Sequence, residues 1–479
     1  MPYQYSPLTG QHEGAVSRAI LQSRREALRA MFKVAAGVGC VPLISACGGG
    51  AEETLPSGST MESEVRRTTQ AARAASALAP LIGPLRAPDA NGVMTPAGFS
   101  TRVVAVAGEA PAAGKPYLWH IFNDGGGVVP LADGGWVYCS NSEVPGAGSI
   151  GFTVPQFATL GNALGEFTPG LGGAGALRFD RTGRIVDAYP ILSGTTFNCA
   201  GAVTPWGTWL SCEEVPKGQV WECDPLGQIP AVARPALGLF SHEAVAIDAA
   251  TRSLYMTEDA PDGRLYRFRS TMLDWPTGAK RPRLQRGSLE VLQVKGLGVD
   301  AILTQGPQPV QWVAAGDAYE PQSENRNPMS TPFDGGEGIW FREGIAYFST
   351  KGDDTIWALD TRAMTLDIVY RAGTDAASVL TGVDNLTVTA AGEILVCEDG
   401  GNMEICVLTP DAPREPKVLL RVVNQDQSEI AGIAFSPDGR RLYFTSDRGG
   451  RNPLGGYMNG PGMLYELTLP TAVTPHFQA

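Results

Sequence analysis

The sequence predicts an all-β fold, a six-bladed β-propeller, from a repeated phrase and its spacing. The phrase occurs six times and is an apolar strand that runs into an acidic or amide tail. Its copies span residues 136–143, 208–214, 253–259, 346–354, 394–400 and 442–447. The acids Glu214 and Glu258 lie 44 residues apart. The gap from Asp353 to Glu398 is 45 residues, and that from Glu398 to Asp447 is 49. A four-stranded blade takes about 40–50 residues, so each copy predicts one blade.

Composition agrees with this fold and limits the partners. The chain has 479 residues, of which 43% are hydrophobic, which is enough for a large core. Its 59 glycines and 36 prolines suit many short strands and tight turns better than long helices. A net charge of −12 argues against a nucleic-acid partner, which usually needs a basic face. The same charge fits either cation binding or plain solubility.

Residues 1–46 are predicted to be a twin-arginine signal peptide of the lipoprotein type. Residues 23–29 read SRREALR, a twin-arginine pattern, and a modestly apolar stretch follows. Residues 44–47 read ISAC and resemble a lipobox with Cys47 as the lipidated residue; the alternative is an ordinary signal peptide with a chance cysteine. We therefore expect export by the twin-arginine route, to the periplasm or to a membrane that the chain contacts only through a lipid on Cys47.

The rest of the chain divides into a tether and one large domain. Residues 47–85 are rich in small and polar residues and predict a flexible tether, with a short helix near 64–81. Residues 86–472 are the predicted propeller, expected to be a monomer. Two gaps between phrases exceed one blade, so we expect excursions in 144–176 and 271–332.

Each acidic-tailed strand follows another strand that has a polar start. In an antiparallel hairpin the start of one strand lies beside the end of the next, so both sets of polar groups lie at one end of the blade. The innermost strands of a propeller line its channel. We therefore expect one mouth of the channel to be crowded by His242, Glu243, Glu337, Asp384, Asn385 and Glu429.

Crowded carboxylates repel one another, and either protonation or bound cations relieve the repulsion. The alternative is that each acid is a solvated residue at a strand end. Repetition of the arrangement in four blades favours cations.

The most specific segment is 198–214, NCAGAVTPWGTWLSCEE. It places Cys199 at a strand entry, where other blades have acids, and Glu213 and Glu214 at the exit of the next strand. Thiolates are strong ligands for iron, zinc or copper, whereas carboxylates suit calcium, magnesium and ferric iron. The pattern therefore predicts a metal site that includes a thiolate.

The other cysteines leave two readings open. Cys397 with Cys406, and Cys212 with Cys223, are each spaced to face one another across a hairpin. Export permits disulfides. Either pair is equally consistent with small buried hydrophobic residues.

Together these motifs resemble the PhoX-type alkaline phosphatase family. Besides segment 198–214, the resemblance rests on FSHEAVAID, YMTEDAPDGRLYRF, GEGIWF, DNLTVT, VCEDG and SEIAGIAFSPDG, which occur in the family's order over residues 85–470. The resemblance implies a six-bladed propeller exported by the twin-arginine route. It also implies hydrolysis of phosphate monoesters at an oxo-bridged cluster of Fe3+ and Ca2+.

Carried over by motif, the resemblance assigns ligands. Cys199 is the implied thiolate on iron, and Glu214, Glu243 and Glu337 are implied carboxylate ligands. Further contributors to the iron or calcium shell are Glu143, Asp384, Glu398 and Glu429.

Two departures from the family pattern bear on substrate binding. The first blade of the family reads Asn-His-Glu, whereas residues 141–143 read Asn-Ser-Glu. The fourth blade reads Arg-x-Glu-Gly with the arginine on substrate phosphate, whereas residues 335–338 read GGEG. A guanidinium is a natural bidentate clamp for phosphate. Arg342, Lys351 and Arg448 are the candidates to supply positive charge in place of that arginine.

The favoured hypothesis is a metal-dependent hydrolase acting on small phosphoric esters, with monoesterase activity weakened by the absent arginine at 335. A calcium-dependent lactonase or a quinone-dependent dehydrogenase on a propeller is one alternative, and it has no need of Cys199. A non-catalytic surface lipoprotein that binds calcium is the other. Iron is expected only for the first.

Overall fold

The computed structural model describes residues 77–144, 172–296, 298–373, 378–409, 414–426, 428–449 and 461–477. All of them belong to the second of two compact units in the chain, Arg66–Ala479. The signal-peptide and lipobox predictions, and most of the predicted tether and its helix, lie outside the described residues.

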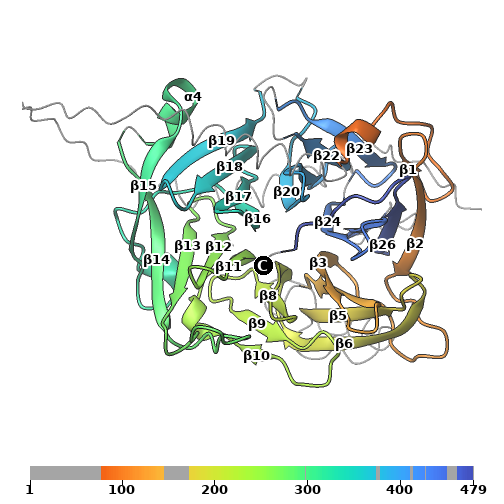
Figure 1. Ribbon diagram of the computed structural model, residues 1–479, viewed down its shortest axis with the longest axis horizontal. Coiled ribbons are helices and arrows are strands. Elements are labelled where there is room, and N and C mark those ends of the chain that lie inside the picture. The colour runs from red at the N-terminus through yellow and green to blue at the C-terminus, as the bar shows by residue number, and fades with distance from the viewer. Residues whose placement is uncertain are drawn as a thin grey trace, which may run out of the picture. The chain divides into compact units, whose positions relative to one another are not determined.

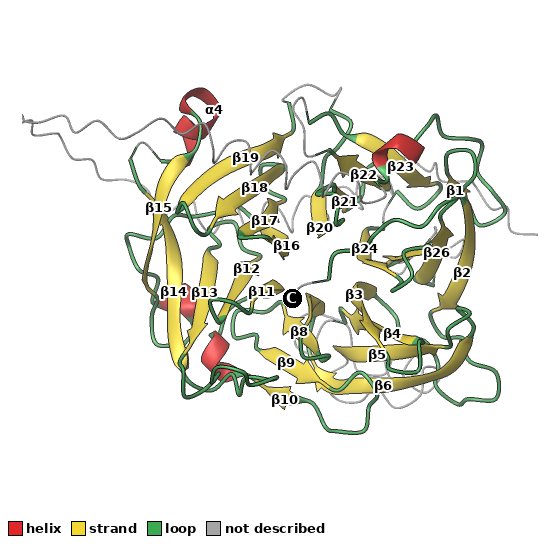
Figure 2. Cartoon of the chain, in the orientation of Figure 1, coloured by secondary structure: helices red, strands yellow, loops and turns green. Residues whose placement is uncertain are grey.

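The protein is an all-β propeller, as predicted. Its strands surround a common centre in Figure 1, and strands rather than helices dominate Figure 2. The helical segments of the described residues are one turn or less: η1 (Ala79–Leu81), η2 (Pro235–Leu237), η3 (Val299–Ala301), α4 (Ile302–Gln305) and η4 (Gln322–Glu324). None of the described helices has the length and hydrophobicity needed to span a bilayer.

Four of the five hydrogen-bonded sheets contain four or five strands, and each of these sheets runs from an innermost strand outward. The first is β3 (Asn123–Pro130), β4 (Trp136–Ser142), β5 (Gly172–Phe179) and β6 (Ile185–Thr195). The second is β7 (Asn198–Val203), β8 (Trp209–Glu213), β9 (Val220–Cys223) and β10 (Val232–Ala233). The third is β20 (Val383–Val388), β21 (Ile394–Glu398), β22 (Glu404–Leu408), β23 (Lys417–Val422) and β1 (Val93–Met94). The fourth is β24 (Ile430–Phe435), β25 (Arg441–Ser446), β26 (Met463–Thr468) and β2 (Ser100–Val106).

The fifth sheet has nine strands because two outer strands join. Its order is β11 (His242–Asp248), β12 (Ser253–Glu258), β13 (Leu265–Ser270), β14 (Gly287–Val294), β15 (Gln308–Ala314), β19 (Thr365–Arg371), β18 (Thr355–Asp360), β17 (Ile345–Thr350) and β16 (Gly336–Arg342). β15 and β19 pair through only two residue pairs, Gln308 with Leu366 and Pro309 with Thr365. The hydrogen bonding therefore gives five sheets where the sequence predicted six separate blades.

The N-terminal part of the described chain closes the ring. β2 pairs with β26, so strands from both ends of the chain share one sheet. Before them, the N–H groups of Leu78 and Ala79 donate to the Glu393 carboxylate at 2.8 and 2.6 Å. Leu78 is fully buried. The chain thus contacts the propeller before residue 86, where the sequence analysis expected that domain to begin.

Residues 271–332, one predicted excursion, hold β14, β15, α4 and η4. β15 lies outside the four strands β11 to β14 and supplies the connection to β19. Most of the other predicted excursion, 145–171, lies outside the described residues.

A β-bulge interrupts the beginning of each innermost strand. The strands β3, β7, β11, β16, β20 and β24 contact one another in this order around a ring. Each loses register with the second strand of its sheet, between Asn123/Gly126, Asn198/Gly201, His242/Val245, Gly336/Ile339, Val383/Leu386 and Ala431/Ala434. A bulge bends a strand and re-aims its side chains, often beside a functional site.

The six described cysteines are all free and buried, which decides between the two readings of their pairing. Cys397 lies opposite Ile405 and Val396 lies opposite Cys406, so the two thiols are one residue out of register. Cys212 lies opposite Val220, and Cys223 lies opposite Trp209. The four cysteines of these two pairs therefore act as small buried side chains, and neither disulfide forms.

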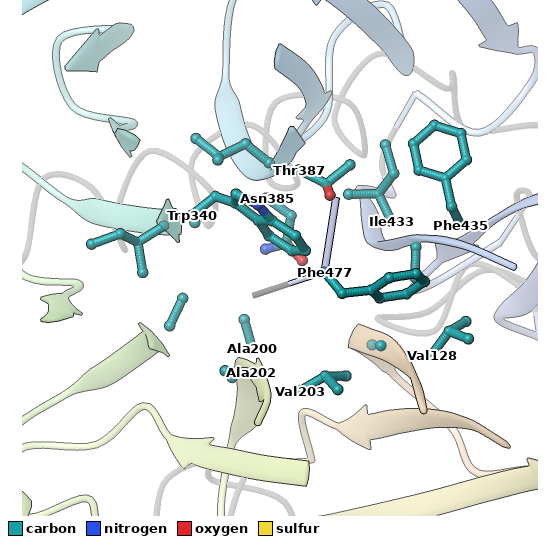
Figure 3. Close-up of a pocket in the computed structure, with 18 of the residues that line it drawn as sticks. Val128, Ala200, Ala202, Val203, Trp340, Asn385, Thr387, Ile433, Phe435 and Phe477 are labelled. Atoms are coloured by element: carbon teal, nitrogen blue, oxygen red, sulfur yellow. The ribbon is translucent and has the colours of Figure 1, made fainter. Parts of the chain in front are cut away.

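The end of the channel opposite the bulges is narrowed by the C-terminal segment. Pro475 bridges to Thr389, and Trp340 Nε1 lies 3.1 Å from His476 Nδ1. A cavity of about 70 Å³ remains there, and Phe477 lies among its lining side chains in Figure 3. Since the lining is mainly apolar, this end offers little to bind a charged ligand.

Candidate metal centre

The bulges place one functional side chain from each of five innermost strands at the same end of the channel. At the equivalent bulge position lie Asp124, Cys199, Glu243, Glu337 and Asp384. The bulge of β24 has Gly432 instead, with φ +61°. A Cβ at Gly432 would lie 2.4 Å from the Tyr138 hydroxyl, so no side chain fits there. The sixth strand contributes Glu429, from just before β24.

A second set of polar side chains follows the second strand of each hairpin. The residues immediately after these strands are Glu143, Glu214, Asp259, Lys351, Asp399 and Asp447. We call them the tail positions. Each tail N–H donates to the carbonyl oxygen of the residue before its innermost strand, at 2.8–3.2 Å; these acceptors are Phe122, Phe197, Ser241, Gly335, Gly382 and Glu429. This bond ties tails and bulges to the same end of the propeller, as the hairpin argument predicted.

Three groups of side chains in this region have metal-ligand spacing. In each group, three ligand atoms lie within 4.8 Å of one another. The groups are Cys199, Glu214 and Glu243; Asp124, Glu143 and Glu429; and Glu243, Glu337 and Asp384. Glu243 belongs to two groups, so the first and third are continuous.

Several of these buried atoms lack a partner among the described residues. Both carboxylate oxygens of Glu243 and Oδ1 of Asp124 accept no hydrogen bond there, although both residues are essentially inaccessible to solvent. The other Asp124 oxygen accepts from Cys199 Sγ at 3.1 Å. Burying an unpaired carboxylate is costly, and coordination of a cation removes the cost.

The electrostatics of the metal-free site agree with that cost. Burial raises the pKa of Glu243 well above its usual range, and Glu337 and Asp124 raise it further. Burial raises the pKa of Asp384 to about 8, and that of Asp447 likewise to about 8. Burial also raises the pKa of the Cys199 thiol, with Asp124 and Glu243 adding to the effect. Without cations, burial therefore favours the protonated forms of Glu243, Asp384 and Asp447.

Two cations border the carboxylates. Lys351 Nζ lies 2.7 Å from Glu337 Oε1 and 3.3 Å from Asp399 Oδ2. The Arg448 guanidinium lies 2.9 Å from Glu429 Oε2 and 2.7 Å from Asp447 Oδ2. Of the three cations that the sequence offered, Arg342 lies elsewhere: its Nη2 donates to Ala390 O and Glu343 Oε1.

A buried amide holds the bulge that carries Cys199. Asn141 Nδ2 donates to the carbonyl oxygens of Cys199 and Ala200 at 3.0 and 2.8 Å. Its Oδ1 accepts from Trp209 Nε1 and Ser211 Oγ. Every hydrogen-bonding position of this amide that faces the bulge is therefore satisfied, which fixes the direction of the Cys199 side chain.

Seven of the eight predicted ligands lie in the three groups, and Glu398 does not. Glu398 is the last residue of β21; its oxygens accept from the N–H groups of Thr381 and Glu404, both at 3.0 Å. Glu213 plays the same part in its own hairpin, accepting from Thr196 and Gln219. Because side chains alternate along a strand, the tail residue Asp399 faces the site and Glu398 faces away.

His242 and Asn385 were expected at the crowded mouth and have other partners. The His242 ring packs on Phe240, and its Nε2 lies 3.0 Å from Gly238 O. Asn385 Oδ1 accepts from the Gly432 N–H. Asn385 Nδ2 also donates to Asp384 Oδ1 at 2.9 Å. His242 joins no group with metal-ligand spacing among the described residues.

Asp124 is the main residue that the sequence argument missed, and Asp399 and Asp447 are the others. β3 reads NDGGGVVP, whose glycines hide the apolar pattern of an inner strand. Its position in the repeat could have identified Asp124. Residues 123–142 form the same kind of hairpin, with a polar start, and the acidic tail residue Glu143 follows directly.

The side chains present fit the metals that the resemblance implies. A thiol beside two carboxylates is a donor set for a transition metal such as iron, and an all-carboxylate group suits calcium. The unpartnered oxygens of Glu243 and Asp124 point to cations as the missing partners.

Comparison with known proteins bears on the family and the fold of the chain. A family model for alkaline phosphatase PhoX matches residues 172–222 and 216–450, more than half of the chain. The solved structure of PhoX from Pseudomonas fluorescens in complex with vanadate, a transition state analogue, is similar with a TM-score of 0.65 and 18% identity, covering 81% of this chain and 98% of that one. At that identity the likeness shows the fold.

Other solved structures are less similar. A gluconolactonase from Xanthomonas campestris has a TM-score of 0.39 and 15% identity, covering 81% of this chain and 98% of its own. The calcium-binding protein regucalcin from Agrobacterium tumefaciens has a TM-score of 0.36 and 14% identity, covering 79% and 96%. These likenesses carry no functional argument. No curated protein matches the sequence.

Proposed function

Because the chain belongs to the alkaline phosphatase PhoX family and is a hydrolase, we propose that it cleaves small phosphoric esters at the carboxylate–thiol cluster. The observation that carries the proposal is the convergence of Cys199 and four buried acids, from five different bulges, on one end of the channel. The unpartnered oxygens of Glu243 and Asp124 support a metal-dependent reaction there.

We propose iron and calcium as the metals. Cys199, Glu214 and Glu243 would hold iron, because a thiolate favours a transition metal. The all-carboxylate groups would hold calcium. When bound, such ions supply positive charge that stabilises a transferring phosphoryl group.

The chain's own residues would prepare the site for that charge. Asn141 fixes the bulge that aims Cys199, and Asp124 Oδ2 accepts a hydrogen bond from the Cys199 thiol at 3.1 Å. Lys351 and Arg448 sit at the border of the cluster, partly exposed, where a substrate anion would arrive. No Ser or His nucleophile is needed in this arrangement.

We propose that monoesterase activity is weaker than an arginine at position 335 would give. Losing a desolvated bidentate phosphate contact costs about 2–5 kcal/mol, or roughly 30- to 4,000-fold in rate. Gly335 has φ +67°, a conformation that disfavours any side chain. Gly335→Arg therefore combines a gain in phosphate contact with backbone strain. Gly335→Ala is the matched control, because it carries the strain without the charge.

We also infer that the propeller has six blades. The nine-stranded sheet then counts as two blades, β11 to β14 and β16 to β19, with β15 linking their outer edges. The sixfold recurrence of the bulge and of the tail hydrogen bond supports this count. For the N-terminal segment we propose twin-arginine export and a lipid on Cys47. For the whole protein we propose a monomeric state.

Elemental analysis tests the metal assignment. Protein purified from a host with a working twin-arginine pathway should contain both iron and calcium. Calcium without iron, together with turnover of lactones, would favour the lactonase alternative. Bound metal with no turnover of an aryl phosphate, a diester panel or a lactone would contradict hydrolysis altogether.

A further inference from the structure

The six tail positions differ in charge in one place. Five carry carboxylates, and position 351 carries a lysine. Arg448 directly follows the tail residue Asp447, so the neighbouring hairpins of β16–β17, β20–β21 and β24–β25 present Lys351, Asp399 and Arg448 in succession. Among the six tail positions and the residues that directly follow them, Lys351 and Arg448 are the two cations.

Asp399 links the two cations. Its Oδ2 lies 3.3 Å from Lys351 Nζ, and its Oδ1 lies 3.7 Å from the Arg448 guanidinium. A carboxylate between two cations holds both head groups in place. Lys351 also pairs with Glu337, and Arg448 also pairs with Glu429 and Asp447. The Lys351 and Arg448 side chains are 29% and 22% exposed, so both are partly accessible to solvent.

Lys351 also lies beside Gly335. Its N–H donates to Gly335 O at 2.8 Å. A Cβ added to Gly335 would lie 3.8 Å from Lys351 Cβ and 3.3 Å from Asp259 Oδ1. A side chain at 335 would therefore start from the same patch of backbone as Lys351.

Side-chain cations at the mouth would attract an incoming phosphate in addition to the proposed metal ions. An incoming phosphate dianion meets a mouth lined by carboxylates, and like charges repel at this range unless cations intervene. Ammonium and guanidinium groups donate strong charge-assisted hydrogen bonds to phosphate oxygens. Lysine acts as a point charge and lacks the bidentate fork of arginine.

We propose that Lys351 and Arg448, linked by Asp399, are the phosphate-binding pair of this site, and that Lys351 supplies the charge absent at position 335. The ligand class is a phosphate monoester or its product, inorganic phosphate. This inference rests on the proposed function. In the metal-free protein Lys351 neutralises Glu337, and metal binding by Glu337 would leave the ammonium for the substrate.

Binding of inorganic phosphate to the metal-loaded protein tests the pair directly. Isothermal titration calorimetry is run on the wild type, Lys351→Gln, Lys351→Arg and Arg448→Gln, all compared at equal metal content by elemental analysis. Lys351→Gln and Arg448→Gln should each weaken phosphate binding by about tenfold or more, because each removes a charge-assisted hydrogen bond. Lys351→Arg keeps the charge and should stay within about threefold of the wild type.

Arg342→Gln is the matched control. It removes a guanidinium of the same propeller whose partners, Ala390 O and Glu343, lie outside the cluster. Its affinity for phosphate should equal that of the wild type. If Arg342→Gln and Lys351→Gln lost phosphate affinity equally, the effect would be due to net charge alone. That result would contradict the proposed phosphate-binding pair.

The outcomes separate this inference from the proposed function. If the wild type binds phosphate and hydrolyses an aryl phosphate while Lys351→Gln binds phosphate equally well, the inference alone is wrong. If the fully metal-loaded wild type neither binds phosphate nor hydrolyses the ester, the proposed function fails and the inference with it.

Discussion

Cys199 is the softest donor in the cluster, and it defines which metal the cluster selects. Its thiol lies 3.1 Å from Asp124 Oδ2 and shares a group with Glu214 and Glu243. Burial keeps the thiol pKa raised in the metal-free protein. A metal ion reverses that preference because a coordinating thiol is deprotonated. We therefore expect iron retention to depend on this sulfur.

Changing Cys199→Ala should abolish iron retention, together with any visible absorption from thiolate-to-iron charge transfer. The alanine removes the soft ligand and leaves a carboxylate set that suits calcium. Elemental analysis and absorption spectroscopy measure both effects. Cys212→Ala is the matched control, since Cys212 is buried and free but belongs to no ligand group. Full iron in the Cys199→Ala protein would make Cys199 a core residue.

Glu398→Gln should leave metal content unchanged and lower stability. The Glu398 oxygens accept two backbone N–H groups, and an amide keeps only one good acceptor for them. A loss of about 1–3 kcal/mol in the free energy of unfolding follows from a buried donor left unsatisfied. Denaturant unfolding and elemental analysis report the two quantities separately. Metal loss without loss of stability would return Glu398 to the ligand set.

The residue identities of the site were largely predictable, but its register was not. Glu243, Glu337 and Asp384 followed from the polar starts of inner strands. Glu398 and Asp399 are adjacent acids, and only the pleat of β21 decides which one faces the channel. Asp124 was not predicted as a site residue because its strand is rich in glycine and lacks the alternation of apolar residues that indicates an inner strand.

At the scale of the element, the bulges depend on small residues where innermost strands approach closely. A Cβ at Gly338 would lie 2.7 Å from Leu386 N and 2.8 Å from Asn385 Cα. Backbone atoms cannot yield as a flexible side chain can. Gly338 thus permits the contact between β16 and β20 that brings Glu337 beside Asp384.

Gly338→Ala should destabilise the protein by about 1–3 kcal/mol, as overpacking typically does. It should also reduce metal content, because β16 must move away from β20. Thermal unfolding and elemental analysis measure these effects. Gly83→Ala is the control, since a Cβ there meets nothing within 4 Å. A Gly338→Ala protein with unchanged stability and full metal would contradict the role given to this bulge.

The hairpins were predictable from alternating polar and apolar residues, whereas the outer edges were not. The pairing of β15 with β19 joins strands more than 50 residues apart and involves only two residue pairs. Such short contacts leave no periodic pattern in the sequence. The pairing of such outer strands is determined by how neighbouring blades pack once they have formed.

At the scale of the molecule, the metal-free propeller gathers buried carboxyl groups at one end of its channel, where their ionisation is unfavourable. Burial raises the pKa of Asp384 and of Asp447 to about 8 from an ordinary value of 3.8. The unfolded chain ionises these groups near pH 4, so the folded state binds more protons up to about pH 8. Their contribution to stability is complete below about pH 4 and is lost as pH rises through about 8.

The melting temperature of the metal-free protein should therefore fall between pH 6 and pH 9. The metal-loaded protein should show a smaller fall, because cations replace the protons on the carboxylates. Thermal unfolding in a pH series, with and without a chelator, measures the difference. A metal-free protein whose melting temperature rises over this range would contradict the assigned burial of these acids.

The whole fold was predictable because the phrase recurs at blade spacing and a repeat determines architecture. The closure of the ring was not, because β2 carries no copy of the phrase and joins β26 from the far end of the chain. The arrangement of the candidate ligands likewise could not be predicted without the fold, since side chains from five strands meet only once the ring closes.

The most direct test of a metal-dependent phosphoric ester hydrolase is phosphate release from an aryl phosphate before chelation, after chelation, and after iron and calcium are returned. We predict measurable release at first, loss of it with the chelator, and recovery only when both metals are restored. Glu243→Gln, which removes a carboxylate shared by two ligand groups, should not recover. Release that persists at full rate in the chelated protein, or no release from the fully metal-loaded protein, would contradict the account.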